Sequence, residues 1–191
     1  MHDRYPNFAA LAEEKNAGID YRIRLIDRAS DVVVLAPHGG RIEPGSSEVA
    51  AAIAGDKYSF YAFEGLRNGR DLHITSRRFD EPRGVALVKG ATTVIAIHGR
   101  ADADEPEDVW LGGRDGATSK AVLGALEQGG FSARVVTGKL AGTSADNICN
   151  RGLTGAGVQL ELPRTLRDRL RQDESILSNF ALAVQSALPR P

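Results

Sequence analysis

Residues 32–43, VVVLAPHGGRIE, join a strand pattern to two side chains that can bind a metal. The first five residues are apolar and mostly β-branched, which is typical of a strand buried on both faces. His38 follows Pro37, two glycines then permit a tight turn, and Glu43 comes five residues after the histidine. Because open α/β sheets place their functional sites at the carboxyl ends of strands, His38 and Glu43 are candidate site residues.

A second unit of the same kind occurs at residues 92–99, TTVIAIHG, where a buried-strand pattern ends in His98 and a glycine. Neutral imidazoles and a carboxylate suit Zn²⁺, and a catalytic zinc site uses three protein ligands and leaves a position for water. We therefore predict that His38, Glu43 and His98 bind one Zn²⁺ per chain. The alternative interpretation gives both histidines purely structural roles.

Strand and helix patterns alternate along the chain, without repeats or low-complexity tracts. This alternation predicts the α/β class, with a mixed, mostly parallel central sheet flanked by helices in a single domain over residues 1–191. The predicted strands cover residues 21–25, 32–36, 58–63, 72–75, 92–97, 109–111, 133–137 and 158–162. The predicted helices cover residues 8–15, 46–54, 84–89, 119–128 and 174–187, with another after Pro163; residues 101–108 and 143–157 are predicted loops.

Composition limits the partners of the chain. The net charge of −1 over 191 residues provides no global field that would favour nucleic acid or an anionic membrane, so we expect neither. Cys149 is the only cysteine, which excludes an intrachain disulfide and a cysteine zinc cluster. The opening residues MHDRY have no apolar signal-peptide core and no stretch has transmembrane length, so we expect a cytoplasmic product, with cell lysis as a route of release.

Glu161 and His73 each have a structural and a functional interpretation. Glu161 ends an apolar strand pattern, where an unpaired carboxylate would be costly to bury. It either forms a salt bridge with Arg164 or Arg167 on the next helix, or serves as a general base beside a metal. His73 lies inside a strand pattern, and a hydrogen-bonded structural role is a simpler interpretation of this histidine than a substrate contact.

The loop at residues 143–157 is rich in glycine and asparagine and is long for a plain connection. Asn147, Asn150 and Arg151 could form a polar clamp for a substrate carboxylate or carbonyl. They could equally be turn residues, because asparagine is common wherever the backbone bends. The sequence leaves these two interpretations open.

Several segments, in a fixed order and spacing, resemble the poly-γ-glutamate hydrolases of bacteriophages and some bacteria. These are zinc enzymes related in fold to the zinc carboxypeptidases. The similarity runs through nearly the whole chain. The segments are YPNF at 5–8, HGGRIE at 38–43, LHITS at 72–76, FDEP at 79–82, IHG at 97–99 and VQLEL at 158–162.

The resemblance implies roles for four residues. His38, Glu43 and His98 correspond to the three zinc ligands, and Glu161 corresponds to the catalytic base. Zinc carboxypeptidases use a His-x-x-Glu pair and a later histidine, and the first pair is two residues longer here. The reaction implied is zinc-dependent hydrolysis of γ-glutamyl amide bonds in poly-γ-glutamate by metal-activated water.

A polyglutamate or acidic peptide substrate would need local cationic groups, because the chain as a whole carries little charge. The turn at residues 76–79 stands where carboxypeptidases bind the terminal carboxylate of their substrate. The candidate substrate-binding residues are Arg41, His73, Arg77, Arg78, Asn147, Asn150 and Arg151, with Arg100 as a further arginine.

Two other functions compete with this hypothesis. The first keeps the zinc chemistry but acts on a small molecule, as an N-acyl amino acid amidohydrolase or a small-peptide carboxypeptidase would. The second is a non-catalytic binding protein whose histidines are structural. Metal content separates the binding protein from the enzymes, and the products separate the polymer hydrolase from the small-molecule hydrolase.

Overall fold

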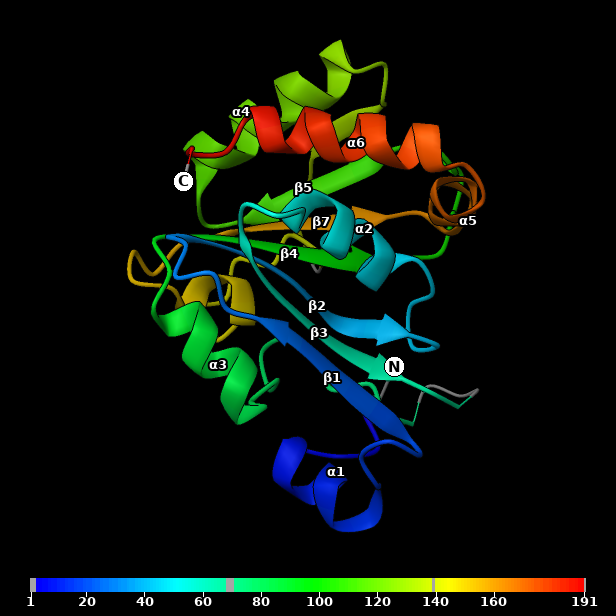
Figure 1. Cartoon of the computed structure of the whole chain (residues 1–191). Coiled ribbons are helices and arrows are strands. Elements are labelled where there is room, and N and C mark those ends of the chain that lie inside the picture. The colour runs from blue at the N-terminus through cyan, green and yellow to red at the C-terminus, as the bar shows by residue number, and fades with distance from the viewer. Residues whose placement is uncertain (1–2, 68–70, 139, 191) are drawn as a thin grey trace.

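The computed structural model describes residues 3–67, 71–138 and 140–190, and these build one seven-stranded sheet with helices on both faces (Figure 1). The strands are β1 (Tyr21–Ile26), β2 (Val32–Gly40), β3 (Ser59–Gly65), β4 (Thr93–Gly99), β5 (Val109–Gly113), β6 (Ala133–Val135) and β7 (Val158–Leu162). The helices are α1 (Phe8–Glu14), α2 (Ser46–Ala54), α3 (Pro82–Lys89), α4 (Gly116–Gln128), α5 (Arg164–Gln172), α6 (Glu174–Ser186) and the 3₁₀ helix η1 (Ile148–Arg151).

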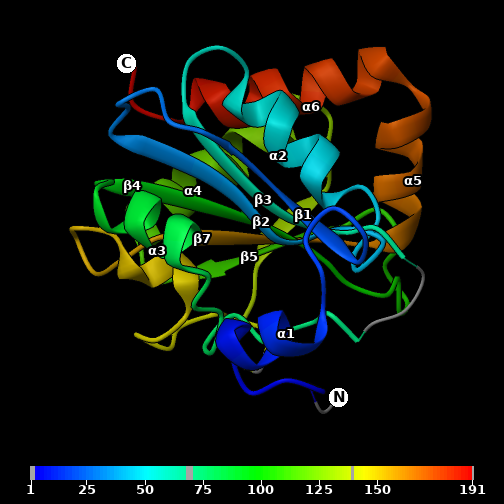
Figure 2. The same ribbon diagram turned by 60° about the horizontal axis from the view of Figure 1, so that its bottom comes forward.

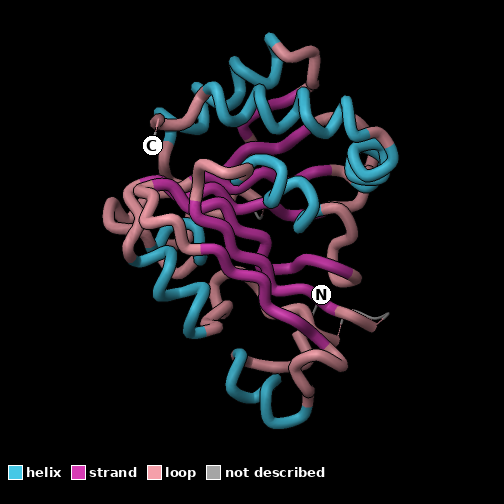
Figure 3. Tube along the Cα trace, in the orientation of Figure 1, coloured by secondary structure: helices cyan, strands magenta, loops and turns pink. Residues whose placement is uncertain are grey.

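The sheet has the order β1-β3-β2-β4-β7-β5-β6 (Figure 3). Its four central strands, β3, β2, β4 and β7, run parallel to one another. β1 is antiparallel to β3, β5 is antiparallel to β7, and β6 is parallel to β5. The predicted α/β class with a mixed, mostly parallel sheet is therefore confirmed.

Two apolar layers cover the sheet. Helices α2, α4, α5 and α6 pack on one face, while α1, α3 and η1 lie on the other (Figures 1 and 2). The first layer contains Phe131 and Phe180, and the second contains Tyr61, Phe63 and Phe79. None of the helices in the described ranges is long and apolar enough to cross a membrane.

The two faces of β2 explain why its sequence is apolar throughout. Val32, Val34 and Ala36 pack in the layer of α2 and α6, whereas Val33 and Leu35 pack in the layer of α3. The pairing of β2 with β3 shifts register between Ala36 and Gly39, around Pro37 and His38. Strict alternation would give residue 38 the face of Ala36, so this irregularity turns the histidine to the face of α3.

The predicted strand at residues 72–75 is wrong. This segment is irregular, although Leu72 and Ile74 are buried in the α3 layer. Side chains rather than a neighbouring strand satisfy its backbone: the Ile74 carbonyl contacts His38, and the Thr75 N–H donates to Asp3. The apolar alternation reflected burial of one side of a loop, which periodicity alone does not distinguish from a strand.

Other predictions need smaller corrections. The strand predicted at residues 32–36 continues to Gly40 and includes His38, and the helix predicted at 84–89 begins at Pro82. β6 ends at Val135 rather than at residue 137. Helix α4 begins at Gly116, three residues earlier than predicted, because the Asp115 side chain accepts a hydrogen bond from the Thr118 N–H and caps the helix. The predicted loop at residues 143–157 contains η1.

The buried Arg167 of α5 ties together the loops that follow three central strands. Its guanidinium donates to the carbonyl oxygens of Pro44, Arg100 (3.1 Å) and Leu162 (3.1 Å). Pro44 and Arg100 follow β2 and β4, and Leu162 is the last residue of β7. A Cβ on Gly99 would lie 2.5 Å from the guanidinium carbon, so the glycine after His98 gives this side chain its room.

We predict that Arg167→Lys lowers the free energy of unfolding by about 2–4 kcal/mol, because one ammonium group cannot replace a fork of donors to three carbonyls and a buried acceptor without a partner costs about 1–3 kcal/mol. Urea unfolding at constant m-value measures the loss. Arg164→Lys is the control: Arg164 lies on the same helix, is exposed and forms its one ion pair among the described residues with Asp168, so its loss should stay within about 0.5 kcal/mol. Equal losses in the two variants would contradict the role of Arg167.

Candidate metal centre

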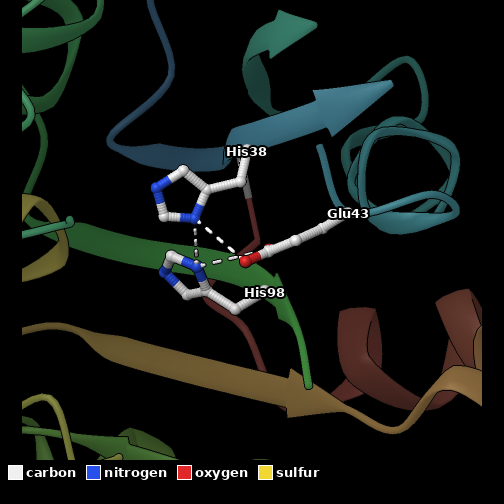
Figure 4. Close-up of side chains that lie close together, drawn as sticks. All are labelled: His38, Glu43 and His98. Atoms are coloured by element: carbon white, nitrogen blue, oxygen red, sulfur yellow. Dashed lines mark hydrogen bonds and ion pairs between the residues drawn. The ribbon is translucent and has the colours of Figure 1, made fainter. Parts of the chain in front are cut away.

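His38, Glu43 and His98 meet at the carboxyl edge of the neighbouring strands β2 and β4 (Figure 4). The two Nδ1 atoms of the histidines are 3.2 Å apart. Oε1 of Glu43 lies 3.2 Å from Nδ1 of His38, and Oε2 lies 3.8 Å from Nδ1 of His98. One possible ligand atom from each residue lies within 4.8 Å of the others, so the structure brings together all three predicted ligands.

Surrounding groups orient each member of this set. Nε2 of His38 lies 2.8 Å from the Ile74 carbonyl, which can only accept, so the proton belongs on Nε2 and the lone pair on Nδ1. Nε2 of His98 lies 3.4 Å from Oγ of Ser76. The N–H of Gly99 donates to Oε2 of Glu43 at 2.7 Å. Partners of this kind hold the ligands of metal sites in position.

The electrostatics of the set fit a cation. Burial alone would lower the pKa of His38, but the charge and hydrogen bond of Glu43 raise it. Burial would raise the pKa of Glu43, yet the two histidines hold it well below its usual range. An ionised carboxylate therefore faces two Nδ1 atoms that lie 3.2 Å apart, so these atoms either share a proton, with one donating to the other, or share a cation. This donor set, one carboxylate and two imidazoles, is one that Zn²⁺ accepts.

The three residues line a cavity of about 1120 Å³. This volume is slightly above the usual range for ligand pockets, about 300–1,000 Å³. The cavity wall also includes Asp3, residues 73 and 75–78 of one turn, and residues 138, 140, 142–144 and 147. The predicted site residues in this wall are His73, Arg77, Arg78, Arg100 and Asn147.

Glu161 is buried in the cavity wall beside His38, Glu43 and His98, which are called the metal set below. Its position on β7 pairs with His98 on β4, and burial raises the pKa of its carboxyl group. Nε2 of Gln159 donates to its Oε1 at 3.0 Å, and the Gln159 amide is itself held by Asn147. Arg167 binds backbone carbonyls instead of this carboxylate, so the salt-bridge interpretation of Glu161 is wrong for that residue. In the described ranges, Arg164 is paired with Asp168 and not with Glu161.

His73, Arg77 and Arg78 differ in how they are held. The His73 ring stacks on His38 with a centroid separation of 4.2 Å, and its Nδ1 lies 2.7 Å from Asp3. Burial lowers the pKa of His73 and the neighbouring His38 lowers it further. Arg78 forms an ion pair with Asp3, whereas the guanidinium of Arg77 has no ion pair with any residue that the structure describes.

The remaining predicted substrate-binding residues make structural contacts. Both side-chain groups of Asn150 are used by backbone atoms of residues 114, 142, 144 and 157. The Arg151 guanidinium donates to the carbonyls of Arg77, Phe79 and Asp146. Arg41 is exposed in the turn after β2 and lies outside the residues that line the cavity. Arg100 donates to four carbonyls of the loop at residues 101–108 and stacks on Trp110. A substrate contact by these residues stays a prediction.

Sequence reasoning missed Asp3, Ser76 and Gln159. Asp3 and Ser76 contact side chains that are 70 and 22 residues away, so no local pattern indicates them. Gln159 had a usable signal, because residues two apart on a strand share a face, and Gln159 therefore lies beside Glu161.

Comparisons with known proteins agree over nearly the full length. A family model described as poly-gamma-glutamate hydrolase matches residues 5–181. The UPF0714 protein YmaC of Bacillus subtilis (strain 168) is 41% identical over 176 residues, which cover 90% of this chain and 73% of YmaC. The chain spans 64% to 73% of the length of the curated relatives that it matches.

Two solved structures share the fold. A bacteriophage poly-gamma-glutamate hydrolase superposes with a TM-score of 0.91 at 30% identity, covering 97% of this chain and 96% of that one. The zinc-free apo form of YndL superposes with a TM-score of 0.89 at 33% identity, covering 97% of both chains. The agreement therefore extends from the sequence to the arrangement of the whole sheet.

We predict that His98→Ala and Glu43→Gln each weaken zinc binding by more than about 100-fold, because loss of a direct ligand should exceed the 10–100-fold effect of losing an outer partner. Equilibrium dialysis with zinc analysis measures the affinity. Glu48→Gln is the matched control, since Glu48 is a half-buried carboxylate on α2 that pairs with Arg171 and accepts from Ser47, outside the residues that line the cavity. Zinc affinity preserved in Glu43→Gln would remove Glu43 from the ligand set.

Proposed function

Because this chain belongs to the poly-γ-glutamate hydrolase family, we propose that it hydrolyses γ-glutamyl amide bonds with a zinc ion held by His38, Glu43 and His98. The observation that carries the proposal is the convergence of these ligand atoms within 4.8 Å, next to a buried carboxylate in the same cavity. The zinc-free form of the related YndL supports the choice of metal.

Glu161 and Gln159 have different roles in the proposed reaction. A bound Zn²⁺ supplies Lewis acidity, which makes water acidic enough to act as a nucleophile near neutral pH. Glu161 accepts the proton of the attacking water and returns it to the nitrogen of the leaving amine. Burial suits Glu161 to this exchange, because a raised pKa brings a carboxyl group closer to neutral pH. Gln159 donates to Oε1 and leaves the other carboxylate oxygen to carry the proton.

Substrate recognition falls to Arg77 in this proposal. Arg77 is exposed in the cavity wall, and its guanidinium has no ion pair with the residues that the structure describes. A guanidinium binds a carboxylate in two parallel hydrogen bonds, which suits the side groups of a polyglutamate chain. The neighbouring Arg78 already has a carboxylate partner in Asp3.

Incubation of the purified protein with poly-γ-glutamate tests the proposal. We expect the polymer chains to shorten, a chelator to stop the reaction and added zinc to restore it. Unchanged chain length with zinc-loaded protein would reject the polymer substrate. Cleavage of small N-acyl amino acids or peptides in the same preparation would favour the small-molecule alternative.

We predict that Glu161→Gln lowers kcat by about 10²–10⁴-fold, because general acid–base catalysis contributes roughly this much and an amide cannot accept the proton. Zinc content should stay unchanged, since the amide keeps most of the size and hydrogen bonds of the carboxylate. Glu64→Gln is the matched control: Glu64 is buried on β3 and pairs with Arg22 and Arg24, away from the cavity wall. Normal turnover per zinc-loaded Glu161→Gln molecule would place the base elsewhere.

We predict that Arg77→Ala raises KM for poly-γ-glutamate about fivefold, which corresponds to the roughly 1 kcal/mol of an exposed ion pair. Added salt should raise KM of the wild-type protein more than KM of the variant, because salt screens the charge that the variant lacks. Arg78→Ala, whose charge Asp3 already balances, should change KM less. An indifferent KM in Arg77→Ala would exclude Arg77 from recognition of the substrate.

A further inference from the structure

Asp3 is a buried carboxylate that binds the turn beside the metal set. Its side chain is only 3% exposed. Oδ1 lies 2.7 Å from Nδ1 of His73, Oδ2 accepts from the Thr75 N–H at 2.8 Å, and Arg78 completes the set. These three partners all come from residues 73–78, about 70 positions along the chain.

The same turn holds both histidines of the metal set. The Ile74 carbonyl accepts from Nε2 of His38, and the Ser76 hydroxyl lies 3.4 Å from Nε2 of His98. The His73 ring, fixed by Asp3, stacks on the His38 ring. Since the turn belongs to no strand, no sheet ladder fixes its position; it is held by these side chains and by the Ile148 N–H, which donates to the Ser76 carbonyl at 3.0 Å.

We propose that Asp3 is a positioning residue of the metal centre: it fixes the 73–78 turn, and through Ile74, Ser76 and His73 it sets the orientation of His38 and His98. The proposal rests on zinc binding under the proposed function. Asp3 touches neither the three metal-binding side chains nor Glu161 by any contact in the described ranges, so it acts through the turn.

A different role for Asp3 would be to dock the N-terminal segment, and the structure offers a way to separate the two. The segment has anchors that do not involve the turn. The Phe8 N–H donates to Asp80 at 2.6 Å, Arg4 donates to Asp71 at 3.2 Å, and Leu11 is fully buried. Asp80 therefore anchors the same segment as Asp3, outside the residues that line the cavity.

The test compares Asp3→Asn with Asp80→Asn, two variants that each remove one negative charge from an anchor of this segment. Zinc affinity is measured by competition with a chromogenic chelator, and thermal unfolding of the zinc-free proteins reports docking. We expect Asp3→Asn to weaken zinc binding about 10-fold, as loss of an outer partner of a metal site does, and to lower kcat more than it changes KM. Asp80→Asn should lower the unfolding temperature without changing zinc affinity.

Ser76→Ala tests the same relay in case Asp3→Asn does not fold. If the turn transmits the effect, Ser76→Ala also weakens zinc binding, and the double variant with Asp3→Asn loses less than the sum of the single losses. Wild-type zinc affinity in Asp3→Asn would overturn the proposal, and so would equal losses of zinc affinity in Asp3→Asn and Asp80→Asn. If Asp3→Asn does not fold, wild-type zinc affinity in Ser76→Ala would overturn it. Zinc binding without hydrolysis of poly-γ-glutamate would reject the proposed substrate and leave this comparison valid, whereas a wild-type chain that binds no zinc would overturn both.

Discussion

The hydrogen bonds of one buried guanidinium hold the carboxyl edge of the sheet together. Arg167 donates to carbonyls in the loops after β2 and β4 and at the last residue of β7, and these loops and strand ends carry Glu43, His98 and Glu161. Burying a cation is costly unless hydrogen bonds compensate it, and here each of its three nitrogens donates to one carbonyl. The site residues come from three separate strands, so their mutual distances depend on this shared contact as well as on the strand pairing.

The class of fold could be predicted from the sequence because a central strand that is buried on both faces has a continuous run of apolar residues. Val32–Ala36 is such a run, and its side chains divide between the two layers as a central strand requires. Residues 72–75 show the limit of the same reasoning. Their alternation is real, but Asp3 and His38 satisfy the backbone there, and neither partner is visible in the local pattern.

The candidate site likewise has a part that the sequence predicts and a part that it does not. His38, Glu43 and His98 could be predicted because each stands at or just after a strand end, and parallel strands bring such ends to one edge. The β2 irregularity that turns His38 to the correct face could not be predicted in detail, although Pro37 and two glycines mark its place. Asp3 could not be predicted at all, because its contacts join residues about 70 positions apart.

The arginines near the cavity show how the molecule separates structural from available charge. Arg100 and Arg151 donate hydrogen bonds to backbone carbonyls, and the charge of Arg78 is balanced by the carboxylate of Asp3. The carbonyls leave the charges of Arg100 and Arg151 in place, but the donors that bind them are not available for paired hydrogen bonds with a substrate carboxylate, and the charge of Arg78 is balanced by Asp3. Arg77 stands apart from these three, and it lies on the very turn that holds the histidines of the metal set. The 73–78 turn thus joins the proposed carboxylate contact to the metal centre, so that a substrate carboxylate and the scissile bond would be placed by one short segment.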